Sequence, residues 1–250
     1  MKLGIVVPVY NRERYVGSAL RSVLRQRDAA DLDIIVIDDG STDGTADVIR
    51  AFIGDGAPIR LFSQPNAGVT KARNAGLRQL CDDTEFVSFL DSDDISPAGR
   101  FAADLAYFKA DPVLELTYSY MRMVDLVDEE ALEPAEGCDE RVFRGIHLSA
   151  GIYARGLVDR IGPFDEELAQ SEDTDFLFRV FEQHARHVFP DTIALYYRQH
   201  PDSLMANRAE VRRQFLRACH KSIVRRRRDP SLGSFQDLIK VDERGLGRGR

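Results

Sequence analysis

Acidic side chains gather in three short stretches of this sequence, at positions 38–39, 91–94 and 172–173. The first two stretches begin where an apolar run ends, at residues 34–37 in one case and 86–90 in the other. Charges at the end of a buried strand cost desolvation energy, so they add nothing to a core. We therefore interpret them as ligands for a cation or a polar substrate. The pattern indicates metal-assisted chemistry on a phosphorylated molecule.

The elements that must position these acids alternate in type along the first 110 residues. Strands are expected at 3–9, 34–37, 59–62 and 86–90, and helices at 16–24, after Ser41 and Thr42, at 70–80 and after Ser96. Ser41 or Thr42 is predicted to cap the second helix, and Ser96, followed by Pro97, the fourth. Continuously apolar strands alternating with helices imply a mostly parallel sheet covered on both faces. In such sheets ligands bind outside the carboxyl ends of the strands, where the first two acidic stretches lie.

The second half of the chain is less regular. Strands are predicted at 114–118 and 193–197, helices at 173–183 and 208–227, and an acidic surface excursion at 125–141. Residues 244–250 contain too little apolar surface to pack, so we expect them to be disordered.

The stretch from Asp38 to Gly44 admits more than one interpretation. It resembles the first half of an EF-hand calcium loop, but Arg50 occupies the position of the closing glutamate and a strand precedes the loop. That interpretation therefore fails. A simple strand-to-helix turn made by Asp, Gly and Ser remains open, as does a carboxylate contact with a nucleobase or ribose.

The motif Asp91-Ser92-Asp93 places two carboxylates two residues apart, just after an apolar strand. Hard cations such as Mg²⁺ and Mn²⁺ take oxygen ligands, often one or two carboxylates together with substrate phosphates. A lone Asp-x-Asp motif is common by chance. Its position after the strand, with Asp94 adding a further negative charge, favours a cation site.

Basic residues occur at two notable places. Lys71 and Arg73 lie near a helix N-terminus, where cations oppose the helix dipole unless they meet a phosphate. A solvated helical face is the alternative there. Residues 225–228 are four consecutive arginines, which most simply form an exposed helix end; a patch facing phospholipid is the other interpretation.

Two further polar positions are undecided by local chemistry. The acidic pair at 172–173 suits the first turn of a helix, and Ser171 could cap that helix, so no functional role is required. His200 follows a predicted strand as a lone histidine, which is more often structural than catalytic or metal-binding.

Composition narrows the class of protein. The chain has 250 residues with a net charge of −7, which argues against general nucleic-acid binding. Its three cysteines are far apart and form no CxxC pair, which fits reduced thiols in the cytosol. Residues 1–8 are too short in their apolar part for a secretion signal, and no apolar run approaches the roughly 18 residues of a membrane span.

Taken in order, the motifs resemble the family-2 glycosyltransferases with the GT-A fold. The matching segments are residues 5–11, 36–45, 66–76, 89–94, 162–166, 172–175 and 197–200. The resemblance implies a GT-A domain over 1–205, with a nucleotide-sugar-binding half (1–110) and an acceptor-binding half (111–205). Residues 206–250 would form a C-terminal helical extension and a basic, disordered tail.

The resemblance also implies roles for individual residues. Asp173 would be the catalytic base, and Asp93 and His200 would hold a divalent cation, Mn²⁺ or Mg²⁺. The nucleotide-sugar donor, with a UDP-sugar as the expectation, would be bordered by Pro8, Tyr10, Asn11, Asp38, Asp39, Arg73, Asp91 and Ser92. Asp39 would make the contact with the base.

The implied reaction is an inverting transfer to an acceptor hydroxyl. A single displacement needs one carboxylate to take the hydroxyl proton and a cation to stabilise the departing diphosphate. Processive members carry a Gln-x-x-Arg-Trp motif and membrane helices, whereas this chain has no tryptophan, so we expect one sugar per encounter. The acceptor could be a glycan, a lipid-linked glycan, a peptide or a small molecule. We expect a cytoplasmic protein, with the basic C-terminal helix available for peripheral contact at the inner membrane face.

Two alternatives remain. A nucleotidyltransferase acting on sugar phosphates also uses an α/β sheet and metal-binding carboxylates, but it usually has a glycine-rich phosphate loop after the first strand. Residues 8–12 contain no glycine. A non-catalytic nucleotide-sugar-binding module is the second alternative, and the retained Asp93 and Asp173 argue against it.

Overall fold

The computed structural model describes residues 1–200 and 208–234 of this chain. In the first half, strands and helices alternate as β1 (Lys2–Val9), α1 (Val16–Leu24), β2 (Asp31–Asp38), α2 (Thr45–Gly54), β3 (Ile59–Ser63), α3 (Val69–Arg78), β4 (Phe86–Phe89) and α4 (Arg100–Ala110). The second half contains β5 (Leu116–Tyr118), β6 (Tyr120–Val124), β7 (Val127–Asp128), β8 (Glu133–Pro134), β9 (Glu140–Phe143), the 3₁₀ turn η1 (Leu148–Ala150), β10 (Gly151–Ala154), α5 (Arg155–Ile161), α6 (Glu172–Glu182), β11 (His187–Val188), β12 (Ile193–Arg198) and α7 (Arg208–Arg228).

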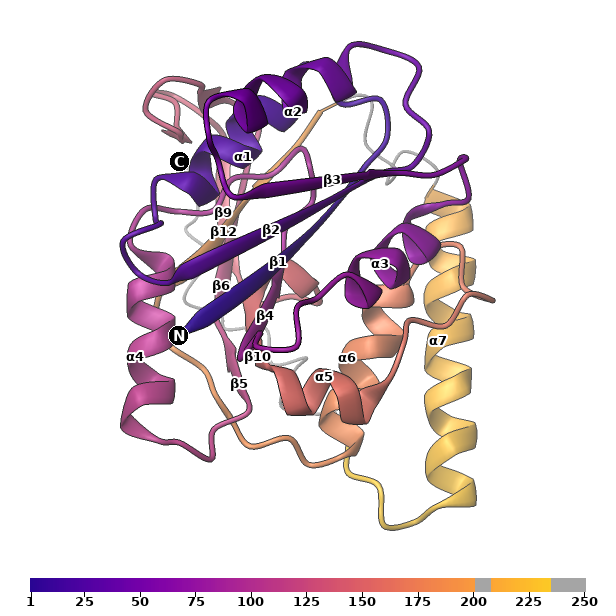
Figure 1. The fold of residues 1–250 in the computed structure, drawn as a ribbon. Helices are drawn as coiled ribbons and strands as arrows, with labels where there is room; N and C mark the ends of the chain where they lie inside the picture. The colour runs from indigo at the N-terminus through magenta and orange to yellow at the C-terminus, as the bar shows by residue number, and fades with distance from the viewer. Residues whose placement is uncertain (201–207, 235–250) are drawn as a thin grey trace.

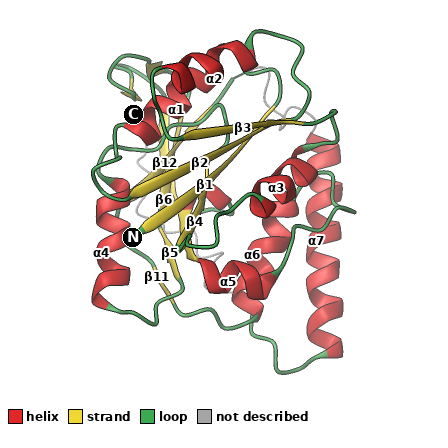
Figure 2. Ribbon diagram, in the orientation of Figure 1, coloured by secondary structure: helices red, strands yellow, loops and turns green. Residues whose placement is uncertain are grey.

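Seven strands form the main sheet, in the order β11-β5-β10-β4-β1-β2-β3. All neighbours pair in parallel except β10, which runs antiparallel between β4 and β5. Helices α1, α2 and α4 lie on one side of this sheet, and α3, α5, α6 and α7 on the other (Figure 1; Figure 2). The predicted mixed α/β architecture with a mostly parallel, doubly covered sheet is confirmed.

Burial on both faces explains the continuous apolar character of the central strands. In β1 every residue from Leu3 to Val9 is buried. Val6 faces α3, and Gly76 of α3 lies so close that an added Cβ would collide with the Val6 side chain. Glycine at this position therefore lets α3 approach the sheet, which fixes where the N-terminus of α3 lies.

Smaller sheets complete the second half. Strands β12, β6 and β9 form a three-stranded sheet, and β7 pairs with β8. The segment 125–141, expected as a surface excursion, contains β7, β8 and the beginning of β9. One isolated bridge between Ile95 and Tyr196 joins the chain after β4 to β12.

Two predicted helix caps are wrong. Helix α2 begins at Thr45 after Gly44, without a side-chain cap from Ser41 or Thr42. Helix α4 begins at Arg100 rather than after Ser96, because the Ser96 hydroxyl instead accepts a hydrogen bond from Gln26 of the turn after α1.

The possible cap Ser171, left open by the sequence, does not cap α6 with its side chain. Its backbone is left-handed, with φ 61°, whereas a capping side chain is normally presented from the β region. The first turn of α6 is nevertheless acidic, as predicted, with Glu172, Asp173 and Asp175.

Helix α7 packs along α6 through a charged contact. Arg225 donates to Asp175 at 2.6 Å and to Glu182 at 2.7 Å, and both carboxylates are almost fully buried. Within the described residues, no helix is both long enough and apolar enough to cross a bilayer. The tail predicted to be disordered, residues 244–250, lies outside the described residues.

Candidate active site at the carboxyl ends of the strands

The polar residues of interest leave one edge of the main sheet. The register pairs Val9 with Asp38 and Val6 with Phe89, so β1, β2 and β4 end side by side. Pro8 is buried in β1, whereas Tyr10, just beyond the strand, is 44% exposed. The predicted nucleotide-binding residues from these three strands therefore share one rim of the sheet.

Asn11 ties the first strand to the turn after the second. Its Oδ1 accepts a hydrogen bond from the Thr42 N–H at 2.8 Å, and its own N–H donates to Ser41 Oγ at 3.0 Å. Asp38 Oδ1 closes the same turn by accepting from the Ser41 N–H at 2.9 Å. Asn11 and Asp38 thus stabilise this turn by hydrogen bonds, which fits the interpretation of residues 38–44 as a simple strand-to-helix turn. Their contact with a nucleotide stays a prediction.

Asp39 holds the loop that leads into α3. Its carboxylate accepts hydrogen bonds from Gln64 Nε2 at 2.7 Å, from the Ala67 N–H at 2.9 Å and from the Gly68 N–H at 2.8 Å. Gly68 has φ 91°, a conformation that favours glycine. Because an ionised carboxylate offers about four lone-pair directions, three such bonds leave room for one more donor. The predicted base contact is therefore compatible with this geometry.

Arg73 connects two of the three acidic stretches. It is 5% exposed; its guanidinium donates to Asp91 Oδ1 at 2.6 Å and also to Glu172 Oε1. Burial lowers the pKa of Arg73, but the charges of Asp91 and Glu172 outweigh it and raise that pKa. The alternative of a solvated helical face describes the exposed Lys71 but not Arg73.

Glu172 and Asp173 differ in their surroundings although they are adjacent. Glu172 is buried, and burial raises its pKa to about 7 despite the opposing charge of Arg73. Asp173 is only partly buried, and its Oδ1 accepts from the Thr174 N–H at 2.6 Å. Of the pair, Asp173 is the carboxylate that a bound hydroxyl can reach.

Asp93 and His200, the predicted metal ligands, are in direct contact. His200 Nε2 lies 3.0 Å from Asp93 Oδ2, and Arg12 Nε donates to the same oxygen at 3.0 Å. Burial disfavours the Asp93 carboxylate, but the hydrogen bond from His200 and the charge of Arg12 hold its pKa below the usual value. The ring of Tyr15 lies against His200 with centroids 4.6 Å apart.

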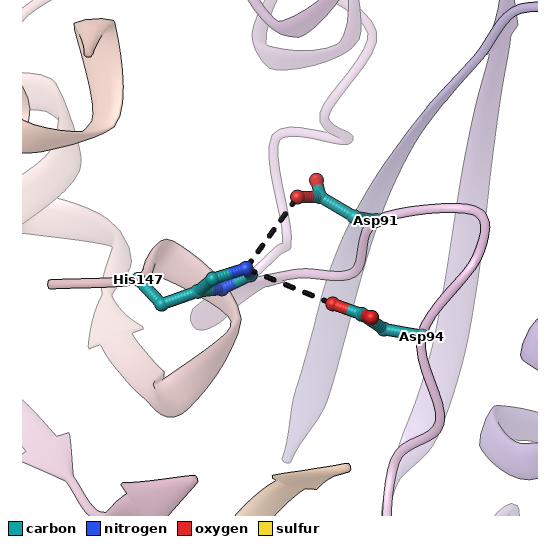
Figure 3. Close-up of side chains that lie close together, drawn as sticks. All are labelled: Asp91, Asp94 and His147. Carbon is teal, nitrogen blue, oxygen red and sulfur yellow. Dashed lines mark ion pairs between the residues drawn. The ribbon is translucent and has the colours of Figure 1, made fainter. Parts of the chain in front are cut away.

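A second acid–histidine cluster lies nearby and was missed in the sequence (Figure 3). His147 points between Asp91 and Asp94, with its Nε2 3.6 Å from Asp91 Oδ2 and 3.6 Å from Asp94 Oδ2. Asp94 is fully buried, and its Oδ2 has no hydrogen-bond partner among the described residues. Burial, followed by the charges of Asp93 and Asp91, raises the pKa of Asp94 well above its usual value.

Both clusters have donor atoms suited to a divalent cation, but their two histidines differ in which ring nitrogen is constrained to carry the proton. The Ser149 N–H donates to His147 Nδ1 at 3.3 Å, so in the neutral ring the proton sits on Nε2, facing the two carboxylates. This tautomer points an N–H group toward Asp91 and Asp94, at 3.6 Å from an oxygen of each. His200 has no hydrogen-bond partner at Nδ1 among the described residues, so that constraint is absent there. Both clusters offer carboxylate and imidazole donors, and the assignment of the cation to Asp93 and His200 stays a prediction.

Ser92, the last of the predicted nucleotide-binding residues, is buried. In the sequence it lies between Asp91 of one cluster and Asp93 of the other. Contacts link Arg73 with Asp91 and with Glu172, the neighbour of Asp173, and link Asp93 with His200. The functional roles of these residues stay predictions. The structure adds Arg12 and His147. No local signal marked His147, because it follows the segment 125–141 and reaches the site only through η1.

Comparison with known proteins shows which proteins this chain resembles. Residues 4–123 match the family model described as Glycosyl transferase family 2. The glycosyltransferase GlyA of Streptococcus pneumoniae is 38% identical over 93 residues, which are 37% of this chain and 13% of GlyA. The uncharacterized glycosyltransferase EpsJ of Bacillus subtilis is 26% identical over 224 residues, covering 81% of this chain and 62% of EpsJ. The chain thus spans less than two thirds of either relative.

Solved structures share the fold. TarS 1–349 of Staphylococcus aureus, crystallised in complex with UDP-GlcNAc, superposes with a TM-score of 0.73 at 23% identity, over 90% of this chain and 66% of the TarS chain. The mannosyltransferase PcManGT of Pyrobaculum calidifontis, in complex with GDP-Man and Mn²⁺, gives 0.68 at 20% identity, over 89% and 64%. The predicted GT-A fold is confirmed.

Proposed function

We propose that this chain, which matches glycosyltransferase family 2 over residues 4–123, is a glycosyltransferase that performs an inverting, metal-dependent transfer of one sugar per encounter. The donor is a nucleotide-diphosphate sugar, with UDP as the expected nucleotide, and the acceptor presents a hydroxyl group. The observation that carries this proposal is the double contact of Arg73. Arg73 joins Asp91, just after β4, to Glu172, which directly precedes Asp173. Asp91, a proposed donor-binding residue, is thereby connected to the residue next to the proposed base.

The donor class is supported by the bound ligands of the structural neighbours. TarS was crystallised with UDP-GlcNAc and PcManGT with GDP-Man and Mn²⁺. In this chain, the residues proposed to border the nucleotide sugar lie on the rim where β1, β2 and β4 end: Pro8, Tyr10, Asn11, Asp38, Asp39, Arg73, Asp91 and Ser92. The exposed Tyr10 ring gives a nucleobase an apolar face against which to stack.

Asp173 is proposed to take the proton of the acceptor hydroxyl. Its partial exposure allows the acceptor to approach, and its hydrogen bond from the Thr174 N–H fixes the orientation of the carboxylate. A positioned general base typically contributes about 10²–10⁴-fold to the rate. Asp93 and His200 would hold the divalent cation, which when bound stabilises the negative charge of the departing nucleotide diphosphate.

Replacing Asp173 by asparagine tests the proposal. A thermal-shift screen of nucleotide sugars with and without Mn²⁺ first identifies the donor, because a ligand of the native state raises the melting temperature. Asp173→Asn should then keep its affinity for that donor but lose at least about 10²-fold in nucleotide release from it. Asp55→Asn, an exposed carboxylate change after α2, is the matched control. Normal release by Asp173→Asn would refute the base assignment.

The acceptor is proposed to bind to the half formed by residues 111–205, which supplies Asp173 and His147 to the site. We also propose a cytoplasmic location with peripheral contact to an anionic membrane surface through α7. This helix contains eight arginines and one lysine against one glutamate, in a chain whose net charge is −7. Phe215, Leu216 and Ile223 are exposed on it, next to arginines, as suits a helix lying at a lipid interface.

A further inference from the structure

Arg12 occupies a position that a cation bound to Asp93 would need. Its Nε–H donates to Asp93 Oδ2 at 3.0 Å, and His200 Nε2 lies 3.0 Å from that same oxygen. The three side chains are shielded from solvent, with exposed fractions of 15% for Arg12, 19% for Asp93 and 6% for His200. The oxygen therefore already has two nitrogen partners in the arrangement described here.

A metal ion bound through Asp93 Oδ2 competes with these two contacts, because Arg12 and His200 already use the lone-pair directions of that oxygen. A divalent ion at Asp93 Oδ2 takes up the lone pair to which Arg12 Nε donates. If His200 Nε2 binds the ion, it can no longer donate a proton to Asp93. The ion would also place two positive charges beside the guanidinium in a poorly solvated site, where like charges repel strongly. Binding of the ion through this oxygen therefore favours the departure of Arg12 from Asp93.

The placement of Arg12 has a clear benefit when no ion is bound. Asp93 lies between Asp91 and Asp94 in the sequence, and a buried carboxylate without a partner is costly. The guanidinium supplies the missing positive charge. Its own main chain is held independently of the side chain, because the Arg12 N–H donates to Thr45 Oγ1 at 2.8 Å and its carbonyl accepts from the Tyr15 and Val16 N–H groups.

We propose that Arg12 is an internal cation that competes with the divalent ion for Asp93, and that the diphosphate of the donor takes over the guanidinium when the ion binds. This inference rests on the proposed metal-dependent function. It has a specific thermodynamic consequence. The ion alone binds weakly, because it must displace Arg12 from Asp93 without supplying an anion in place of that carboxylate; the main-chain carbonyl of Asn11, to which the guanidinium also donates at 3.1 Å, carries no charge. With a nucleotide diphosphate present, the displaced guanidinium gains a counter-ion, so ion and nucleotide strengthen each other's binding by the same factor.

The experiment measures Mn²⁺ binding, by electron paramagnetic resonance of free Mn²⁺, with and without UDP. Arg12→Gln should bind Mn²⁺ alone roughly ten- to hundredfold more tightly than the unchanged protein, the equivalent of one hydrogen bond to a charged group. The same variant should show a smaller enhancement of Mn²⁺ binding by UDP. Arg14→Gln, which removes an exposed arginine two residues away, is the matched control and should leave both quantities unchanged.

Two further variants separate the possible failures. Asp93→Asn should abolish Mn²⁺ binding; if it does not, both the proposed metal site and the competition are wrong. If Asp93→Asn abolishes binding but Arg12→Gln binds Mn²⁺ no more tightly than the unchanged protein, the competition alone is wrong. Arg12→Lys keeps the charge and should behave like the unchanged protein, which distinguishes loss of the cation from loss of folding should Arg12→Gln be unstable.

Discussion

Replacing Arg73 by methionine should strongly destabilise the protein. The change removes the shared cation of two shielded carboxylates while keeping a long side chain in the space at the start of α3. Arg73 and Glu172 are both nearly buried, and Asp91 is 28% exposed. Removing one partner of a buried ion pair costs about 3–5 kcal/mol, because the remaining charge is left without compensation. For a chain of this size each kcal/mol lowers the melting temperature by about 2–4 °C.

We therefore expect Arg73→Met to melt roughly 6–20 °C below the unchanged protein at pH 8. Circular dichroism at 222 nm, with urea denaturation as a second measure, gives the comparison. Lys71→Met is the matched control, since Lys71 is an exposed cation on the same helix and its loss should shift the melting temperature little. The double variant Arg73→Met/Glu172→Gln should recover part of the loss, because it removes the charge that the single variant leaves unpaired.

The ion-pair reasoning is refuted if Arg73→Met melts within the range of Lys71→Met. It is also refuted if adding Glu172→Gln to Arg73→Met lowers the melting temperature further by the full amount of the single change. Either result would mean that the carboxylates do not depend on Arg73 for compensation.

Three other predictions follow from the site and from α7. For Glu172, burial raises the pKa to about 7 from the ordinary 4.5. Between these pH values the folded state keeps a proton that the unfolded state loses. The free energy of unfolding should therefore fall as the pH rises from 4.5 to 7. Glu172→Gln should flatten that fall, by up to about 3 kcal/mol, in urea titrations from pH 4.5 to 8; an unchanged slope would contradict the assigned burial effect. For His147, whose ring lies 3.6 Å from Asp91 and Asp94, His147→Leu should weaken UDP binding about tenfold, because the two carboxylates then face the diphosphate without an N–H group between them; His147→Gln, which retains an N–H group, should restore much of it. Calorimetry with Mn²⁺ is the discriminating measurement, because equal loss of Mn²⁺ affinity in both variants would make His147 a metal ligand instead. For α7, sedimentation with vesicles containing phosphatidylglycerol should show binding that Arg212→Gln/Arg227→Gln weakens about tenfold or more, at about 1 kcal/mol per basic residue near the surface. Equal binding to vesicles of phosphatidylcholine alone would contradict an electrostatic membrane contact.

The sequence predicted the elements of the first half well because their apolar patterns are dictated by burial. Strand β1, expected at 3–9, is observed at Lys2–Val9, and the helix expected at 70–80 is α3 at Val69–Arg78. The helix caps failed for a different reason. A serine near a helix start can bond elsewhere, as Ser96 does with Gln26, and periodicity contains no information about that competition.

The site was predictable only where its residues lie in recognisable motifs. Asp91, Asp93 and Asp173 were singled out in this way, although Asp173 could not be distinguished from an ordinary helix start by local chemistry, and their roles stay predictions. Arg12 and His147 were not found. Arg12 meets Asp93 across 81 positions of sequence, and His147 reaches Asp91 through a turn in a region without a periodic pattern. Contacts of this kind depend on the completed fold, so no local sequence pattern predicts them.

The position of β10 has a consequence for how the chain assembles. Strand β4 pairs with β1 on one side, but its other partner is β10, and β5 reaches the sheet only through β10. During synthesis, β1 to β4 can therefore pair with one another as soon as they emerge, while one side of β4 stays open until residue 154 arrives. Such late, long-range pairing slows folding and leaves an unpaired strand edge exposed in the meantime. Nascent chains that stop before β10 should accordingly be aggregation-prone, whereas those that include it can close the sheet.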